Sequence, residues 1–183
     1  DHKWWNKISD YIHSCEVVTY EQAWLNVIYR YSPESSSTVD TGEAFLNDMA
    51  RACSERGITM QYCMALPCYF LQGSSYKNLT TIRVSDDRFI PARWNDFLYT
   101  SRLAGSLGIW PWCDVFMSGE TNNLLLATLS AGAVGIGDPI GKENKGNLLK
   151  SVSADGVIVK PDVPCVPLDR CYIADANHAD DPL

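Results

Sequence analysis

Acidic residues stand at the ends of four short apolar segments that have the composition of β-strands. Glu21 follows VVTY, Asp86 and Asp87 follow TIRVS, Asp114 ends WPWCD and Asp138 ends AVGIGD. Carboxylates gathered in one cleft repel each other, so the pKa of one rises while another stays ionised. Glycoside hydrolysis uses this pair of states, one acid for the leaving oxygen and one carboxylate for the anomeric carbon. A single acid at a strand end is more often a helix cap, but the repetition favours a shared site for sugar chemistry.

Aromatic and basic side chains accompany the acids. Trp110 and Trp112 precede Asp114 and offer flat apolar faces of the kind on which sugar rings stack. Arg83 lies just before Asp86, where its charge can orient a carboxylate. We therefore expect these side chains to contact a carbohydrate substrate.

The acids can meet only if the apolar segments are parallel strands. Strand-like segments occur near residues 17–20, 58–64, 80–85, 108–115 and 133–138, and helical segments lie between them. Trp5, Ile8 and Ile12 recur at helical spacing, as do Phe45 and Met49. Strands that alternate with helices indicate an α/β fold with a parallel sheet, in which the strand ends share one edge.

The polar stretch YSPESSSTVD, residues 31–40, contains Pro33 and three serines, which predicts a loop. Asp40 stands three residues before Glu43, the spacing of a reciprocal helix cap, so a helix is expected to begin at Asp40. Gly57 is the residue type expected just past the end of that helix.

The character of the sequence changes after Gly141. Asp155-Gly156 is typical of a tight hairpin turn, and three prolines follow at residues 161, 164 and 167. We predict an α/β region over residues 1–143 and the start of a β-rich, sandwich-like region over residues 144–183.

The bulk composition excludes several classes of function. The 183 residues carry a net charge of −7, which argues against a nucleic-acid partner because phosphate binding needs Lys and Arg. No apolar run is long enough for a membrane span, no C-x-x-C pair suggests zinc, and we expect neither a metal nor a cofactor. The seven cysteines leave at least one free thiol, and Cys63/Cys68 and Cys165/Cys171 are candidate disulfides. The compartment stays open, with secretion favoured.

Five ordered blocks between residues 78 and 174 resemble raffinose synthases and related α-galactosidases, which are clan D, family 36-like glycoside hydrolases. In that family the blocks run approximately R-x-S-D-D-F, P-D-W-D-M-F, Y-V-S-D-x-P-G-K-H-N-F-x-L-L-K, L-P-D-G-x-V-L and P-T-R-D-C-L-F. The counterparts here are residues 83–87, 111–116, 136–150, 154–159 and 167–172.

The resemblance implies the C-terminal part of a (β/α)8 barrel, about strands four to eight, and a retaining mechanism on α-linked galactosides. It implies that Asp86 is the general acid/base, that Asp87 holds the loop, and that Asp138 and Asp114 match acids of the last two strands. A complete barrel takes about 250 residues. We therefore expect the same polypeptide to supply the remainder of the barrel.

The sequence departs from the family at the nucleophile. The family's fourth strand carries K-x-D, whereas VVTYEQAWL stands here, so the nucleophile position falls on Glu21 in one alignment and on Ala23 in another. Trp112 and Cys113 replace an aspartate and a tryptophan of the family, which leaves the sugar open. A catalytically inactive carbohydrate-binding homologue is the alternative. A nucleotide-binding domain is disfavoured, because the glycines of GAVGIGDPIG do not fit G-x-G-x-x-G.

Overall fold

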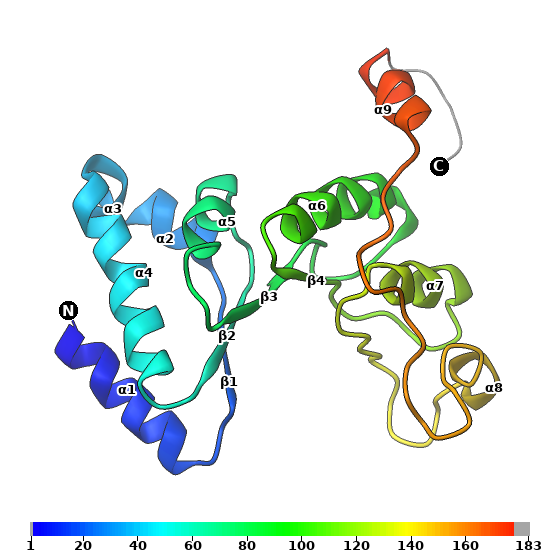
Figure 1. Cartoon of the computed structure of the whole chain (residues 1–183), viewed down its shortest axis with the longest axis horizontal. Helices are drawn as coiled ribbons and strands as arrows, with labels where there is room; N and C mark the ends of the chain where they lie inside the picture. Colours follow the sequence, from blue (N-terminus) through cyan, green and yellow to red (C-terminus); the bar gives the residue numbers. More distant parts are fainter. Residues whose placement is uncertain (1, 178–183) are drawn as a thin grey trace. The chain divides into compact units, whose positions relative to one another are not determined.

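The computed structural model describes residues 2–177, which form an α/β fold with a four-stranded parallel sheet alternating with helices (Figure 1). The strands are β1 (Thr19–Gln22), β2 (Thr59–Tyr62), β3 (Leu79–Arg83) and β4 (Trp110–Trp112), in the order β1-β2-β3-β4. The predicted α/β class is therefore confirmed, and the barrel stays a prediction.

The chain divides into two compact units. The first comprises Asp1–Arg83 with Leu107–Ile109, and the second comprises Val84–Ser106 with Trp110–Leu183. The predicted boundary between residues 143 and 144 stays a prediction, and residues 178–183 of its second region lie outside the described residues.

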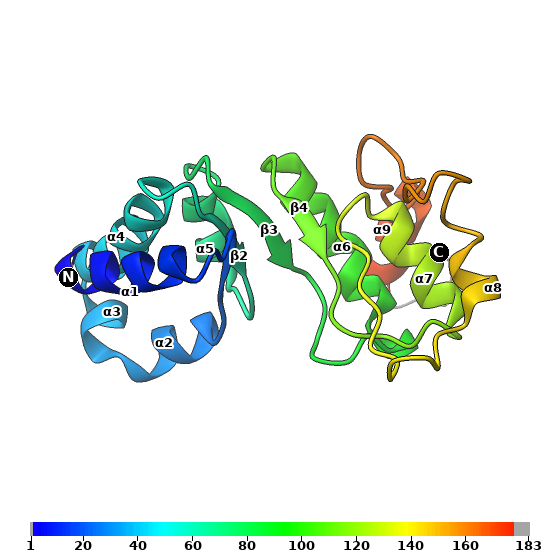
Figure 2. The same ribbon diagram turned by 90° about the horizontal axis from the view of Figure 1, so that it is seen from below.

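The first unit holds β1, β2 and β3 together with a group of helices. Its helices are α1 (His2–Ser14), α2 (Leu25–Tyr31), α3 (Pro33–Ser37), α4 (Val39–Ser54) and α5 (Pro67–Gly73). Figures 1 and 2 show α1 and α4 side by side, and Trp5 is buried between them and the sheet, 5.3 Å from Phe45 and 6.1 Å from Tyr20 between ring centroids. The helices predicted from the spacing of Trp5, Phe45 and Met49 are confirmed.

The segment of residues 31–40 differs from its prediction. It forms α3 and the start of α4 instead of a loop, because a proline at the first helical position has a suitable φ and needs no N–H partner. The cap predicted at Asp40 is also wrong, since the N-cap residue of α4 is Thr38. The Thr38 hydroxyl donates to Glu34 O over 2.8 Å and lies 2.8 Å from Thr41 Oγ1, which joins the two helices. Gly57 follows α4 with φ +68°, as predicted for the helix end.

The second unit holds a short 3-10 helix, η1 (Pro91–Arg93), and the helices α6 (Trp94–Ser106), α7 (Thr121–Leu129), α8 (Lys145–Leu148) and α9 (Asp169–Ala176). Phe89 and Phe97 form its aromatic core, with ring centroids 4.7 Å apart. The strand predicted at residues 133–138 forms two isolated parallel bridges, Trp112↔Ala133 and Phe116↔Ile136, because its glycines offer no side chains to pack.

The end of the described chain contains the predicted hairpin turn. Gly156 has φ +89°, and Val152 and Ile158 form an antiparallel bridge around it, whereas α8 and α9 are helical. None of the cysteines, all of which lie within residues 2–177, forms a disulfide bond, so the two candidate pairs are not made. No helix in this part of the chain has the length and apolar character to cross a membrane.

Candidate functional site

A polar ladder crosses the first three strands in the first unit. Glu21, Gln61 and Thr81 are register partners on β1, β2 and β3, so their side chains share one face of the sheet. Gln61 Nε2 donates to Glu21 Oε2 over 2.9 Å, and Thr81 Oγ1 donates to Gln61 Oε1 over 3.0 Å. We call Glu21, Gln61 and Thr81 the polar ladder. It fixes an exposed carboxylate on the sheet through one of its oxygens.

Two further predicted residues lie at the ends of these strands. Arg83 follows Thr81 by two residues on β3, which puts it on the face of the polar ladder, and it is 8% exposed. Ala23, the other position considered for the nucleophile, lies just past the end of β1, and its carbonyl accepts a 2.7 Å hydrogen bond from Gln22 Nε2. Of the two candidates, Glu21 alone has a group that can act as a nucleophile.

Asp86 and Asp87 are exposed in the loop that follows β3. Arg93 Nε lies 2.7 Å from Asp86 Oδ2, and Arg93 Nη1 lies 3.0 Å from Asp96 Oδ2. The hydrogen bond that Arg93 donates to Asp96, and then the charge of Asp86, raise the pKa of Arg93, so the guanidinium stays charged. The loop thus holds Asp86 as one half of an exposed ion pair.

Trp112 and Asp114 line a cavity of about 150 Å³ in the second unit, together with Cys113, Val115, Gly135 and Ile136. Asp114 N donates to Ser85 Oγ over 2.7 Å, and Asp114 Oδ1 accepts from Val115 N over 2.6 Å. Burial raises the pKa of the Cys113 thiol to about 12, which leaves it neutral at pH 7. Trp110 is 45% exposed.

Asp138 accepts hydrogen bonds through both of its carboxylate oxygens. Its two carboxylate oxygens accept from Ser118 N over 2.7 Å and from Ser118 Oγ over 2.9 Å. Ser118 is fully buried and also accepts from Asn144 N over 2.6 Å and Asn147 Nδ2 over 2.5 Å. The carboxylate of Asp138 therefore anchors the turn before α7.

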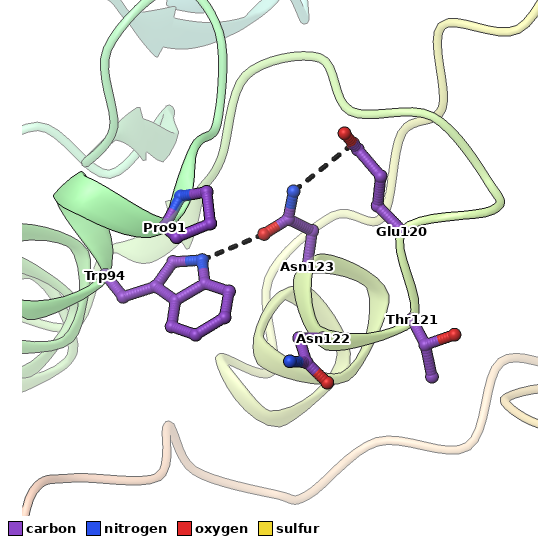
Figure 3. A pocket seen from close by; sticks show the side chains of 6 residues that line it. All are labelled: Pro91, Trp94, Glu120, Thr121, Asn122 and Asn123. Carbon is purple, nitrogen blue, oxygen red and sulfur yellow. Dashed lines mark hydrogen bonds between the residues drawn. The ribbon is translucent and has the colours of Figure 1, made fainter. Parts of the chain in front are cut away.

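A larger cavity, of about 300 Å³, lies between the start of α6 and the start of α7 in the second unit (Figure 3). We call it the Trp94 pocket. Its lining residues are Pro91, Trp94, Glu120, Thr121, Asn122 and Asn123. Trp94 Nε1 donates to Asn123 Oδ1 over 2.8 Å, and Asn123 Nδ2 donates to Phe89 O over 2.9 Å.

Glu120 is the acid of the Trp94 pocket. Arg88 donates to its Oε1, and Met117 N and Asn123 Nδ2 donate to its Oε2 over 2.8 and 3.2 Å. The Arg88 hydrogen bond is the main cause that holds the pKa of Glu120 below its usual value. Glu120 is therefore ionised and its charge is matched by Arg88.

Trp94, Glu120 and Asn123 are not among the residues predicted from the sequence. Trp94 begins α6, Glu120 and Asn123 lie at the start of α7, and no motif spacing links them. One signal was present, because Glu120 directly precedes the apolar helix α7, but an acid at a helix start is ordinarily a cap.

The structure brings together some of the predicted residues. Trp112 and Asp114 share one cavity, Glu21 is bound by Gln61, and within the second unit Asp86 and Asp138 each have their own partners. Within residues 2–177 no cluster of three or more His, Cys, Asp or Glu side chains is placed to hold a metal ion. No protein-family model matches the chain, and no curated protein matches it.

Proposed function

We propose that this protein acts on α-linked, galactoside-type sugars as a retaining glycoside hydrolase or transglycosidase. In this proposal the parallel sheet belongs to a (β/α)8 barrel completed by the same polypeptide. The observation that carries the proposal is that acids occur on or just past parallel strands, Glu21 on β1, Asp86 after β3 and Asp114 after β4. The family-like motif blocks of the sequence support it independently.

The two steps divide between two carboxylates. Glu21 attacks the anomeric carbon to form a glycosyl ester, while Asp86 gives its proton to the leaving oxygen. Asp86 then removes a proton from water, or from the hydroxyl of an acceptor sugar, which releases the product and restores Glu21. Because Arg93 pairs with Asp86 in this structure, the substrate has to displace that guanidinium before Asp86 can carry a proton.

The remaining predicted residues hold the sugar. Trp110 and Trp112 present ring faces to it, and charged groups bind its hydroxyls. The proposed substrate contacts are Arg83, Asp87, Trp110, Trp112, Asp114 and Asp138.

The test is the hydrolysis of aryl α-galactosides by the wild type, Asp86→Asn and Glu21→Gln. Loss of a positioned acid lowers turnover by about 10²- to 10⁴-fold. With a dinitrophenyl leaving group, which departs without a proton, the loss in Asp86→Asn should shrink, whereas the loss in Glu21→Gln should not. Asp162→Asn, the same change at an exposed position, is the matched control. Full turnover in both Asp86→Asn and Glu21→Gln contradicts the proposed roles.

A second candidate function is carbohydrate binding without catalysis. The ion pair of Asp86 with Arg93 favours it, because a carboxylate paired with a guanidinium is not in the form that donates a proton. This candidate predicts that the wild type binds methyl α-galactoside but releases no aryl alcohol above the buffer control.

A further inference from the structure

We propose that the Trp94 pocket binds a single neutral, hydroxylated ring, such as one pyranose unit. None of its lining residues belongs to the set proposed for catalysis. The inference shares with the proposed function only the premise that this protein handles carbohydrate, and it does not require turnover.

The size and shape of the Trp94 pocket suit one ring. Its volume of about 300 Å³ is at the lower end of the range of about 300–1,000 Å³ that small-molecule sites occupy. Figure 3 shows Pro91 and Trp94 on one side of the pocket and the first residues of α7 on the other. The hydrogen bond from Trp94 Nε1 to Asn123 holds the indole in place before any ligand arrives, so little ordering is left to the binding step.

The charges around the Trp94 pocket favour a neutral ligand. Glu120 is the only acid that lines it within the described residues, and its carboxylate already accepts from Arg88, Met117 N and Asn123 Nδ2. The negative charge of Glu120 is therefore compensated by the guanidinium of Arg88. A cation would compete with Arg88, and an anion would face a carboxylate.

The polar groups that remain are suited to hydroxyls. The side-chain amide of Asn122 is exposed and makes no hydrogen bond within residues 2–177, so it offers both donors and an acceptor. An amide and a flat indole that line the same pocket match a sugar ring, which has an apolar face of C–H groups and a rim of hydroxyls. A purely apolar ligand would leave the Asn122 amide without a partner.

The experiment is ligand-observed saturation-transfer NMR on the full chain, with methyl α-galactopyranoside as the probe and galacturonate and galactosamine as charged comparators. Asn122→Ala should weaken binding by about fivefold to tenfold, the worth of one hydrogen bond. Trp94→Ala should weaken it by about tenfold or more, because it removes the ring face. Asn95→Ala, the same change at an exposed residue of the first turn of α6, should leave binding unchanged.

Circular dichroism shows whether the Trp94→Ala variant folds. If that variant does not fold, the Asn122→Ala variant still tests the inference, because Asn122 is exposed and its loss should not affect folding. The inference is overturned by the absence of saturation transfer to the wild type at millimolar glycoside, by equal binding of folded Asn122→Ala and wild type, or by tighter Asn122-dependent binding of a charged sugar. Loss of binding in Asp86→Asn alone also overturns it, because the sugar then binds at the acids. If no glycoside is hydrolysed but binding depends on Asn122, the proposed function fails and the inference stands.

Discussion

Two tyrosines in the first unit should respond to the same substitution with opposite signs. Tyr62 on β2 is fully buried, and its hydroxyl has no hydrogen-bond partner within the described residues. The Tyr76 hydroxyl donates to Asn47 Oδ1 over 2.5 Å and accepts from Gln72 Nε2 over 2.6 Å. Replacing each tyrosine by phenylalanine removes one hydroxyl oxygen. The oxygen of Tyr62 lowers the stability of the folded state, whereas the oxygen of Tyr76 raises it.

The expected changes follow from the surroundings of each hydroxyl. A buried polar group without a partner costs about 1–3 kcal/mol. Part of that gain is lost because the removed oxygen leaves a small void, so Tyr62→Phe should stabilise the protein by about 1 kcal/mol. The half-buried Tyr76 loses hydrogen bonds worth about 0.5–1.5 kcal/mol each, so Tyr76→Phe should destabilise it by about 1 kcal/mol. The two variants should thus differ by about 2 kcal/mol.

Urea unfolding followed by circular dichroism measures both values. The midpoints should move in opposite directions while the slope stays unchanged, since a single hydroxyl alters little of the surface exposed on unfolding. A Tyr62→Phe variant that is less stable than the wild type would refute the reasoning, because its hydroxyl would then contribute to the folded state. Equal destabilisation by both substitutions would refute it as well.

Three further outcomes follow from the charges and close contacts. Burial raises the pKa of Tyr62 above its usual 10.0, so the stability linked to it is present below pH 10 and lost as pH rises further, and Tyr62→Phe should lose less in alkaline urea titrations. The pKa of Glu120 lies below its usual 4.5. Glu120→Gln should therefore lower the free energy of unfolding by about 1 kcal/mol or less at pH 7, since the pair with Arg88 is partly exposed. This difference from the wild type should vanish in acid unfolding curves as pH falls below 4.5 through the lowered pKa. Gly132→Ala should destabilise by at least about 2 kcal/mol in thermal unfolding, because its Cβ would lie 1.6 Å from Pro111 O, whereas Gly119→Ala, with open space, should change little.

Local sequence patterns predicted those helices and strands whose conformation depends on their own residues more than on contacts with distant ones. The spacing of Trp5, Ile8 and Ile12 gives α1, and the strand-favouring residues 79–82 before Arg83 give β3. The predictions were wrong where one residue type is compatible with two kinds of local structure. Pro33 begins a helix, although proline is also common in loops. Asp40 lies inside α4, although aspartate is also common as an N-cap residue. These choices depend on neighbouring turns more than on the residue itself.

The candidate site was predictable to the extent that it follows strand order. Glu21 was expected at the end of a parallel strand, and its hydrogen bond to Gln61 follows from the register of β1 and β2. The Trp94 pocket was not predictable in this way. Trp94 and Glu120 line one cavity only because the starts of α6 and α7 come together in the same unit, which holds the buried pair Phe89 and Phe97.

The polar ladder also helps to fix the register of the strands in the sheet. Side chains alternate between the two faces of a strand, so sliding β2 by one position would carry Met60 and Tyr62 to the polar side and Gln61 into the core. Such a slip would break the contacts of Gln61 with Glu21 and Thr81, and the 2.8 Å contact between the hydroxyls of Thr19 and Thr59. The face of the sheet that exposes Glu21 to solvent therefore also specifies the register of the strands.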